Sequence, residues 1–203
     1  AERDRALADS VPPAELEGSA LVEFHEERGL AAGRIGRVRQ QIDDHTKAVE
    51  LAHEGYYADK SRLLWELAVA ESVAGSLADA IEHATKAIEA IPQNMVGRGI
   101  GYRSMLAIRR ARTGDLERAW IELEKAERIL EIARGWTAWG KWGGHWRSAV
   151  LIAKAYLLYT RGEYVEAEPF YQAAIQLVEE NVDRYDDDPR INYRLYHEAI
   201  LGE

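Results

Sequence analysis

The sequence predicts an all-α fold in which antiparallel helix hairpins stack into a solenoid, and three observations support this expectation. The first is a turn glycine followed five positions later by a small residue and seven positions after that by another, as in Gly114, Ala119 and Ala126. The same spacing recurs at Gly75, Ala80 and Ala87 and at Gly162, Ala167 and Ala174. The second is a composition rich in alanine, leucine and glutamate, which favour helices. The third is that no segment shows the apolar–polar alternation typical of strands.

Composition and charge narrow the class of protein. The chain has 203 residues, 47% of them hydrophobic, and can bury a substantial core. Its formal net charge of −9 argues against nucleic acid as the main partner, because nucleic-acid-binding domains usually carry excess positive charge. It has no cysteine and no apolar run near the roughly 18 residues that a membrane span needs. The compartment stays open: the cytoplasm is slightly favoured, and the periplasm fits if Ala1 follows a removed signal peptide.

The N-terminal region has the least regular pattern. Residues 1–10 are polar with charges of both signs, and we expect the N-terminus over 1–12 to be flexible. Apolar positions at helical spacing predict a helix over about 14–29, which Gly29 and Gly33 are expected to end. A second helix is predicted over about 35–53 and completes the first hairpin.

The segment from Trp65 to Pro92 holds the clearest repeat. The residues that carry it are Trp65, Gly75, Ala80, Ala84, Ala87 and Pro92. In their spacing they resemble the tetratricopeptide repeat (TPR), with Ala68-Val69 and Ser72 in place of its usual Leu-Gly pair and tyrosine. The resemblance implies a TPR-like α-solenoid, which is a right-handed superhelix of antiparallel hairpins.

The turn glycines measure the period of the repeat. Gly36, Gly75 and Gly114 follow one another at intervals of 39 residues, and Gly162 follows after 48. Because the standard TPR period is about 34 residues, the chain is similar to the long-repeat TPR solenoids that precede effector modules in large bacterial proteins. We therefore expect a single TPR-like domain over 13–203. Its hairpins are predicted at about 13–54, 59–92, 97–134 and 145–183, with a terminal half-hairpin at 190–203.

The TPR resemblance also implies where a partner binds, since the first helices of successive TPR hairpins line a concave groove. Carried over by register, the groove positions are Glu66, Ala70 and Val73, then Ser104, Ile108 and Arg112, then Ile152, Tyr156 and Tyr159. Glu66 and Ala70 replace the lysine and asparagine of chaperone-tail-binding TPRs, so that specificity is not supported. We expect a non-enzymatic protein-interaction scaffold that binds a peptide or helix in this groove. The alternative is a ligand-sensing regulatory domain that relays to an effector module.

A tryptophan-rich segment fills the 48-residue interval and is a second candidate for partner binding. Its tryptophans are Trp136, Trp139, Trp142 and Trp146. They either pack between lengthened repeats or form a binding patch, because tryptophan is enriched at hot spots. Gly140, Gly143 and Gly144 favour a loop here. The segment partly fits a phosphate-loop pattern, but Trp142 stands where a serine or threonine must hold magnesium.

An arginine-rich stretch precedes the tryptophans. From Ala90 to Gly114 the sequence has no acidic residue. It contains Arg98, Arg103, Arg109, Arg110 and Arg112. These arginines are expected either to pair with acidic side chains of neighbouring helices or to bind an anionic ligand or acidic peptide. The planar guanidinium suits the second role because it holds carboxylates through two hydrogen bonds.

No pattern in the sequence assembles a catalytic or metal site. Glu50 and His53 form a single Glu-x-x-His pair, whereas a carboxylate di-iron site needs two such pairs and two more glutamates. The run Asp186–Asp188 lacks the glycine and distal glutamate of a calcium-binding loop. We therefore expect no enzyme activity, no metal and no cofactor.

The C-terminal stretch predicts an incomplete hairpin. Leu201-Gly202 falls where a repeat carries its Leu-Gly pair, so the chain ends either in a capping helix or within a repeat of a longer protein. Tyr193, Tyr196 and Ile200 would then lack a covering helix. Because uncovered apolar faces usually bind a partner, we expect a homodimer through the terminal helices.

Overall fold

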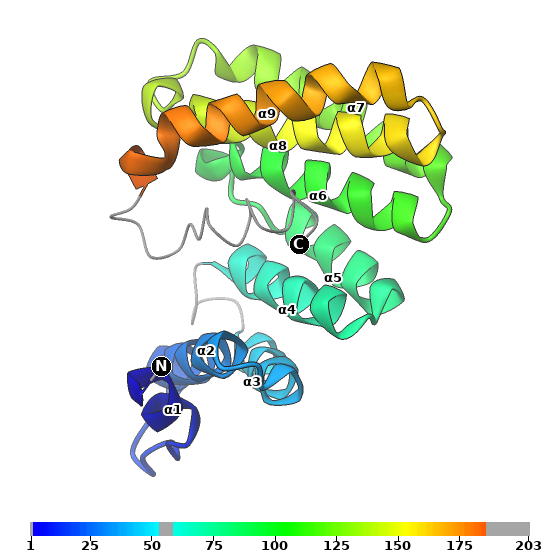
Figure 1. Cartoon of the computed structure of the whole chain (residues 1–203). Coiled ribbons are helices and arrows are strands. Elements are labelled where there is room, and N and C mark those ends of the chain that lie inside the picture. The colour runs from blue at the N-terminus through cyan, green and yellow to red at the C-terminus, as the bar shows by residue number, and fades with distance from the viewer. Residues whose placement is uncertain (1, 53–58, 186–203) are drawn as a thin grey trace. The chain divides into compact units, whose positions relative to one another are not determined.

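The computed structural model describes residues 2–52 and 59–185, with side chains through residue 180, and these residues form α-helices joined by turns (Figure 1). The all-α hairpin fold predicted from the sequence is confirmed. The chain divides into two compact units, Ala1–Met95 and Val96–Glu203, which we call the N-terminal and C-terminal units. The predicted domain, 13–203, spans both of them.

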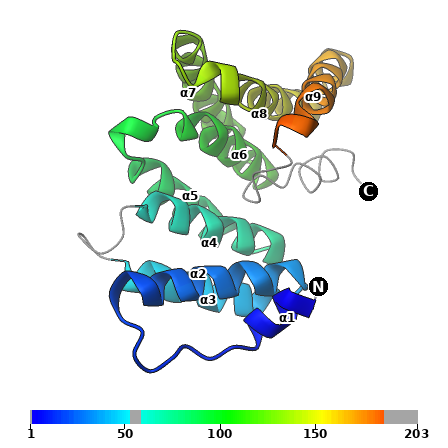
Figure 2. The ribbon, with the colours of Figure 1, turned by 90° about the vertical axis from the view of Figure 1, so that its left-hand side faces the viewer.

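The N-terminal unit contains two helix hairpins preceded by a short helix. Its elements are α1 (Glu2–Ala8), α2 (Gly18–Arg34), α3 (Val38–Leu51), α4 (Lys60–Ala74), α5 (Leu77–Glu89) and the 3-10 helix η1 (Gln93–Met95). Helices α2 and α3 form one hairpin and α4 and α5 the other, while α3 also packs against α4. Figure 2 shows α2 and α3 lying side by side.

The start of the chain folds where the sequence suggested a flexible segment. Helix α1 packs against α2, and Ala8 at its end is buried. Side chains from the first hairpin hold the backbone that follows. The Nε2 atom of Gln40 donates to the carbonyl of Ala8 (2.6 Å), and Nη1 of Arg28 donates to the carbonyl of Ser10 (2.9 Å). Polar contacts from α2 and α3 therefore order a segment that has little apolar pattern of its own.

The expectation that Gly29 and Gly33 end the first helix is wrong, because α2 continues to Arg34. A Cβ atom at Gly29 would lie 3.0 Å from Cε1 of His45, and one at Gly33 would lie 2.6 Å from Cδ of Gln41. Without side chains at these positions, α3 can approach α2 closely. This packing outweighs the ~1 kcal/mol by which glycine disfavours a helix.

The C-terminal unit contains two longer hairpins. Its helices are α6 (Arg98–Arg112), α7 (Leu116–Ala133), α8 (Trp139–Thr160) and α9 (Tyr164–Tyr185). Helices α6 and α7 form one hairpin and α8 and α9 the other, and α8 packs against α6 and α7 as well. One continuous apolar cluster joins three of these helices, from Ile100 on α6 through Leu123 on α7 to Trp146 and Leu157 on α8. Helix α8 is thus the central element of the unit.

The turn glycines end their helices in the same way each time. Gly36, Gly75, Gly114 and Gly162 have φ angles of 78°, 86°, 82° and 82°, a left-handed conformation that favours glycine. After each one, the next residue donates its amide to the carbonyl five residues earlier, as Ser76 does to Glu71 (2.9 Å). The periodic glycines of the sequence therefore mark repeated helix ends.

The expectation of a loop around Gly140, Gly143 and Gly144 is also wrong, since all three lie within α8. A Cβ atom at Gly143 would lie 2.9 Å from the ring of Trp139. The glycine thus gives the tryptophan ring space to lie along its own helix. The interval of 48 residues is filled by a longer helix rather than by a loop.

Several predictions from the sequence concern residues outside the described ranges. These are the terminal half-hairpin at 190–203, the homodimer through Tyr193, Tyr196 and Ile200, the acidic run Asp186–Asp188, and His53.

Candidate partner-binding surface

Six of the nine predicted groove positions lie on two neighbouring helices, α6 and α8, and four of these six side chains are not fully buried. Because consecutive helices are antiparallel, α6 and α8 run in the same direction. Ile108 and Tyr156 each precede a turn glycine by six residues and are partly buried against the apolar core of the C-terminal unit. Arg112 and Tyr159 lie one turn further on, and both are exposed. Ile108 and Tyr156 therefore hold matching positions on adjacent helices, while Arg112 and Tyr159 lie near the ends of those helices.

Tyrosines gather where α8 ends and α9 begins. The rings of Tyr159 and Tyr164 meet edge to face, with centroids 5.0 Å apart, and these residues are 55% and 60% exposed. Burial raises the pKa of Tyr171 on α9, and the nearby Tyr156 and Tyr159 raise it further. We call Tyr156, Tyr159 and Tyr164 the tyrosine surface. The sequence pattern missed Tyr164 and Tyr171, although Tyr164 follows the turn glycine Gly162 by two residues.

The other predicted groove positions divide between the two units and between core and surface. Ser104 and Ile152 are buried in the C-terminal unit, where the Ser104 hydroxyl donates to the Ile100 carbonyl (2.8 Å). On α4 of the N-terminal unit, Ala70 is buried and Val73 is exposed. Glu66, also on α4, is partly buried; burial raises the pKa of its carboxyl, and the charge of Arg62 opposes that rise. The tyrosine surface is therefore defined on the C-terminal unit alone.

The four tryptophans cluster at the start of α8. Trp146 is only 7% exposed, and the ring centroids of Trp136 and Trp139 lie 6.0 Å and 6.4 Å from its own. Trp136, Trp139 and Trp142 are partly buried and pack against the same core. This geometry favours the packing interpretation for Trp146 and leaves parts of the other three residues at the surface.

The arginine-rich stretch forms several ion pairs within its own unit. Arg103 pairs with Glu122 (2.5 Å), and Arg110 pairs with Asp115 (3.3 Å). Arg109 is buried at 3% exposure. Arg112 is exposed and makes no hydrogen bond or ion pair with the described part of the chain. Of this stretch, Arg112 is thus well placed to bind an external carboxylate.

The side chains exposed here are aromatic rings, Tyr159 and Tyr164, and the guanidinium group of Arg112. Within residues 2–52 and 59–185, no group of three or more histidine, aspartate or glutamate side chains is arranged to hold a metal ion. In those same ranges, no helix combines the length and apolar character needed to cross a membrane.

Comparison with known proteins agrees with the fold. No family model and no curated protein matches the chain. The crystal structure of MamA is similar over 80% of this chain and 81% of MamA, with 17% identity and a TM-score of 0.51. The Rap conjugation gene regulator of plasmid pLS20, solved in complex with the Phr* peptide, is similar over 99% of this chain with 16% identity and a TM-score of 0.59. This chain spans about half of Rap (52%). The likeness shows that the chain has a TPR-like helical-repeat fold.

Proposed function

We propose that this chain is a protein-interaction scaffold that binds a peptide segment of a partner on the tyrosine surface and Arg112. One observation carries the proposal: the rings of Tyr159 and Tyr164 meet edge to face at the surface while both residues stay more than half exposed. Exposed, mutually supported aromatic rings offer a large contact area with little loss of side-chain freedom on binding. Tyrosine and arginine are also the residue types enriched at binding hot spots.

Each part of the surface has a different task in this proposal. The tyrosine rings contact apolar side chains of the peptide, and their hydroxyls bond to its backbone. Arg112 pairs with a carboxylate of the peptide, since its guanidinium is exposed at the end of α6. Ile108 on α6 and Tyr156 on α8 both pack against the core of the unit. Trp136, Trp139 and Trp142 lie at or just before the opposite end of α8 and are not part of this surface.

The comparison with Rap supports this class of ligand. Rap was solved in complex with a peptide, and its similarity in fold extends over 99% of this chain. A fold of this kind therefore accommodates a peptide in at least one protein. The residues that would contact a peptide in this chain are those of its own tyrosine surface.

A peptide selection tests the proposal. Random dodecapeptides displayed on phage are selected on the wild-type chain, and the Kd of each selected peptide is measured by fluorescence anisotropy. The double variant Tyr159→Ala/Tyr164→Ala should raise the Kd at least about tenfold, as loss of a hot spot does. Arg112→Gln should raise the Kd of peptides that carry a carboxylate about fivefold.

The matched control is Ile132→Ala, which removes an exposed apolar side chain from α7 of the same unit. Its Kd values should stay within about twofold of wild type, because a scattered surface residue contributes little. Selected peptides that bind the double tyrosine variant as tightly as wild type would place the binding site elsewhere and contradict the proposal.

A ligand-sensing regulatory domain is the second candidate, and the description of Rap as a gene regulator favours it. The two candidates differ in the ligand that stabilises the fold. A scaffold should gain thermal stability from selected peptides, whereas a metabolite sensor should gain it from a small molecule, because ligands that bind only the native state raise its Tm.

A further inference from the structure

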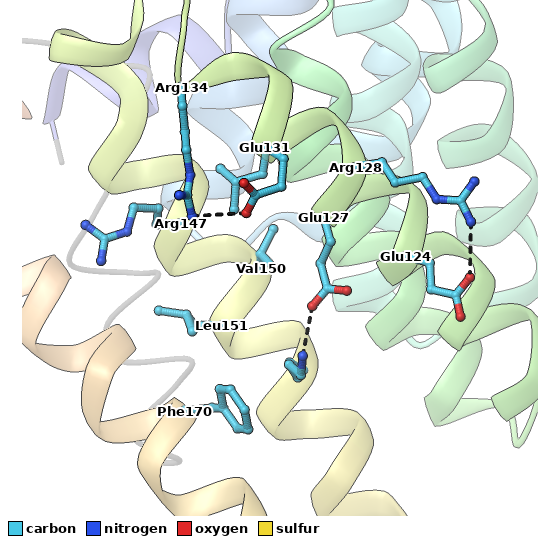
Figure 3. A pocket seen from close by; sticks show the side chains of 11 residues that line it. Glu124, Glu127, Arg128, Glu131, Arg134, Arg147, Val150, Leu151 and Phe170 are labelled. Atoms are coloured by element: carbon cyan, nitrogen blue, oxygen red, sulfur yellow. Dashed lines mark hydrogen bonds and ion pairs between the residues drawn. The ribbon is translucent and has the colours of Figure 1, made fainter.

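A groove lies between α7 and α9 in the C-terminal unit, with α8 as its floor (Figure 3). It encloses about 580 Å³. Helix α8 packs against both α7 and α9, so the groove is held by the core of the unit. Its apolar lining comes from all three helices: Leu130 on α7, Val150 and Leu151 on α8, and Phe170 on α9.

This groove is separate from the tyrosine surface, because the two use opposite sides of α8. At about 100° per helical residue, Arg147, Val150, Leu151 and Lys154 share one side of the helix. Tyr156 and Tyr159 point roughly 160° away from the middle of that side. A ligand in the groove therefore needs no contact with the tyrosine surface.

A lysine ties the walls of the groove together at one end. The Nζ atom of Lys154 lies 3.0 Å from Oε1 of Glu127 on α7 and 5.2 Å from the ring centroid of Phe170 on α9. Lys154 thus extends from the floor to both walls, and its charge is neutralised by Glu127. This end of the groove is occupied by the chain's own side chains.

The opposite end of the groove carries a cation that is not neutralised. The other acidic lining residues pair within or next to α7: Glu124 with Arg128 (3.6 Å) and Glu131 with Arg134 (3.0 Å). Arg147 is exposed and makes no ion pair or hydrogen bond with the described part of the chain. In Figure 3 its side chain extends from α8 away from the Arg134–Glu131 pair.

The charge balance of the groove is opposite to that of the whole chain. Four basic and three acidic residues line it, so its formal charge is +1, whereas the chain carries −9. The positive excess corresponds to one unneutralised arginine beside an apolar floor. A volume of about 580 Å³ accommodates a few side chains and excludes a whole helix.

We infer that this groove binds an acidic peptide segment of a partner protein. An aliphatic or aromatic side chain of the peptide packs on Val150, Leu151 and Phe170. An aspartate or glutamate side chain near it in the peptide sequence pairs with Arg147, whose planar guanidinium binds a carboxylate through two hydrogen bonds. This second peptide site is independent of the proposed function, since it uses the other side of α8.

An NMR titration tests the inference. The probe is acetyl-Glu-Leu-Phe-Glu-Asp-Leu-amide, whose capped ends leave the side-chain carboxylates as its charged groups. Added to the ¹⁵N-labelled full chain, it should shift the amide signals of α8 around Arg147 and Leu151 and give a measurable Kd. Raising NaCl from about 0.1 M to about 1 M should weaken binding, because salt screens an exposed ion pair.

Two variants and a second peptide isolate the ion pair. Arg147→Gln should weaken binding about tenfold. Its matched control is Arg118→Gln, which removes an arginine whose side chain is 71% exposed on α7; its Kd should match wild type. The neutral peptide acetyl-Gln-Leu-Phe-Gln-Asn-Leu-amide should bind the wild type about as weakly as the acidic peptide binds Arg147→Gln.

Four results would overturn the inference. In the first, the acidic peptide shifts no amide signal of α8. In the second and third, the neutral peptide binds the wild type as tightly as the acidic one does, or the acidic peptide binds Arg147→Gln as tightly as wild type. In the fourth, the acidic peptide binds only the triple variant Asp186→Asn/Asp187→Asn/Asp188→Asn. The last would identify the chain's own acidic run, which lies outside the described residues, as the occupant in place of a partner.

Discussion

The two units share a pattern of helix hairpins but bury different chemistry. The N-terminal unit buries a set of charged and titratable side chains: His25, Glu26, Asp44, His45 and Glu71. Its buried apolar clusters are small, one around Val22 and Leu63 and one around Ala31. The C-terminal unit instead has a continuous apolar cluster with Trp146 within it. The C-terminal unit also buries Arg109 and Glu122, so the difference is one of balance: more buried charged side chains in the N-terminal unit and a larger apolar cluster in the C-terminal unit.

Asp44 shows how the polar interior of the N-terminal unit works. Its carboxylate on α3 accepts hydrogen bonds from Nε and Nη2 of Arg28 (3.0 Å and 2.6 Å) and lies 2.9 Å from Nδ1 of His25. Arg28 and His25 both lie on α2. A second buried carboxylate, Glu26 on α2, pairs with Arg62 on α4. Fixed geometry is required for these contacts, so they specify how the helices align.

The largest expected loss of stability that distinguishes the two units follows from removing the carboxylate of Asp44. Asp44→Asn keeps the volume of the side chain but leaves the partly buried guanidinium of Arg28 without its counter-charge. Breaking a buried ion pair in this way costs about 3–5 kcal/mol. Urea unfolding followed by far-UV circular dichroism should show this loss, and hydrogen exchange measured by mass spectrometry should rise in α2 and α3 more than in α8.

Asp43→Asn is the matched control, because Asp43 precedes Asp44 on the same helix and is exposed. It should change the free energy of unfolding by less than about 0.5 kcal/mol. If the Asp44 variant lost no more stability than this control, the buried ion pairs would not be what holds the first hairpin together.

The second effect is a pH dependence of the free energy of unfolding, which arises from His45. This side chain is fully buried, and neither ring nitrogen has a hydrogen-bond partner within the described chain. Burial lowers the pKa of His45 from 6.5 to about 4, with the charge of Asp44 opposing the shift. The unfolded chain therefore binds a proton between these pH values that the folded chain does not. The free energy of unfolding should therefore be highest above pH 6.5. It should fall by up to about 3 kcal/mol as the pH drops towards 4.

His45→Leu removes this titration and should flatten the fall measured by urea unfolding at several pH values. Burial also lowers the pKa of His145 in the C-terminal unit to about 4, so His145→Leu should remove a separate share of the fall. Full retention of the wild-type pH profile in His45→Leu would mean that other groups cause the acid sensitivity of the N-terminal unit.

The contrast between the units explains how far sequence could predict the structure. The turn glycines, such as Gly75 and Gly114, were found because a left-handed helix end is a local property of the chain. Gly29 and Gly143 were misread because their roles depend on a ring packed over them, His45 from another helix and Trp139 from the preceding turn. Propensity alone treats all these glycines alike.

The candidate binding residues follow the same rule. Arg112 and Tyr159 could be proposed because the repeat fixes their register. Arg128 and Arg134 pair with glutamates three or four residues away along the chain. Arg147 could not be singled out, because its place beside Leu151 and Phe170 depends on how α8 and α9 pack. A count of charges along the sequence does not contain that information.

The smallest of the three expected losses of stability comes from side-chain packing in the C-terminal unit. Gly97, just before α6, has ordinary helical φ and ψ angles of −57° and −28°, which alanine adopts without strain. A Cβ atom there would lie 2.5 Å from Cζ2 of Trp146, and the surrounding Trp136 and Trp139 rings restrict any displacement of that ring. Gly97→Ala should therefore destabilise the chain by about 1–3 kcal/mol, as overpacking does, measured by the urea midpoint of tryptophan fluorescence.

Gly140→Ala is the matched control in the same unit. Gly140 lies in the first turn of α8, and a Cβ atom there would meet nothing within 4 Å. Alanine is favoured over glycine in a helix, so this variant should leave stability unchanged or raise it by up to about 1 kcal/mol. The opposite signs of the two glycine-to-alanine changes would isolate the contact with Trp146. If both variants shifted the midpoint in the same direction, the ring of Trp146 would be free to move, and its packing on Gly97 would not contribute to the stability of this unit.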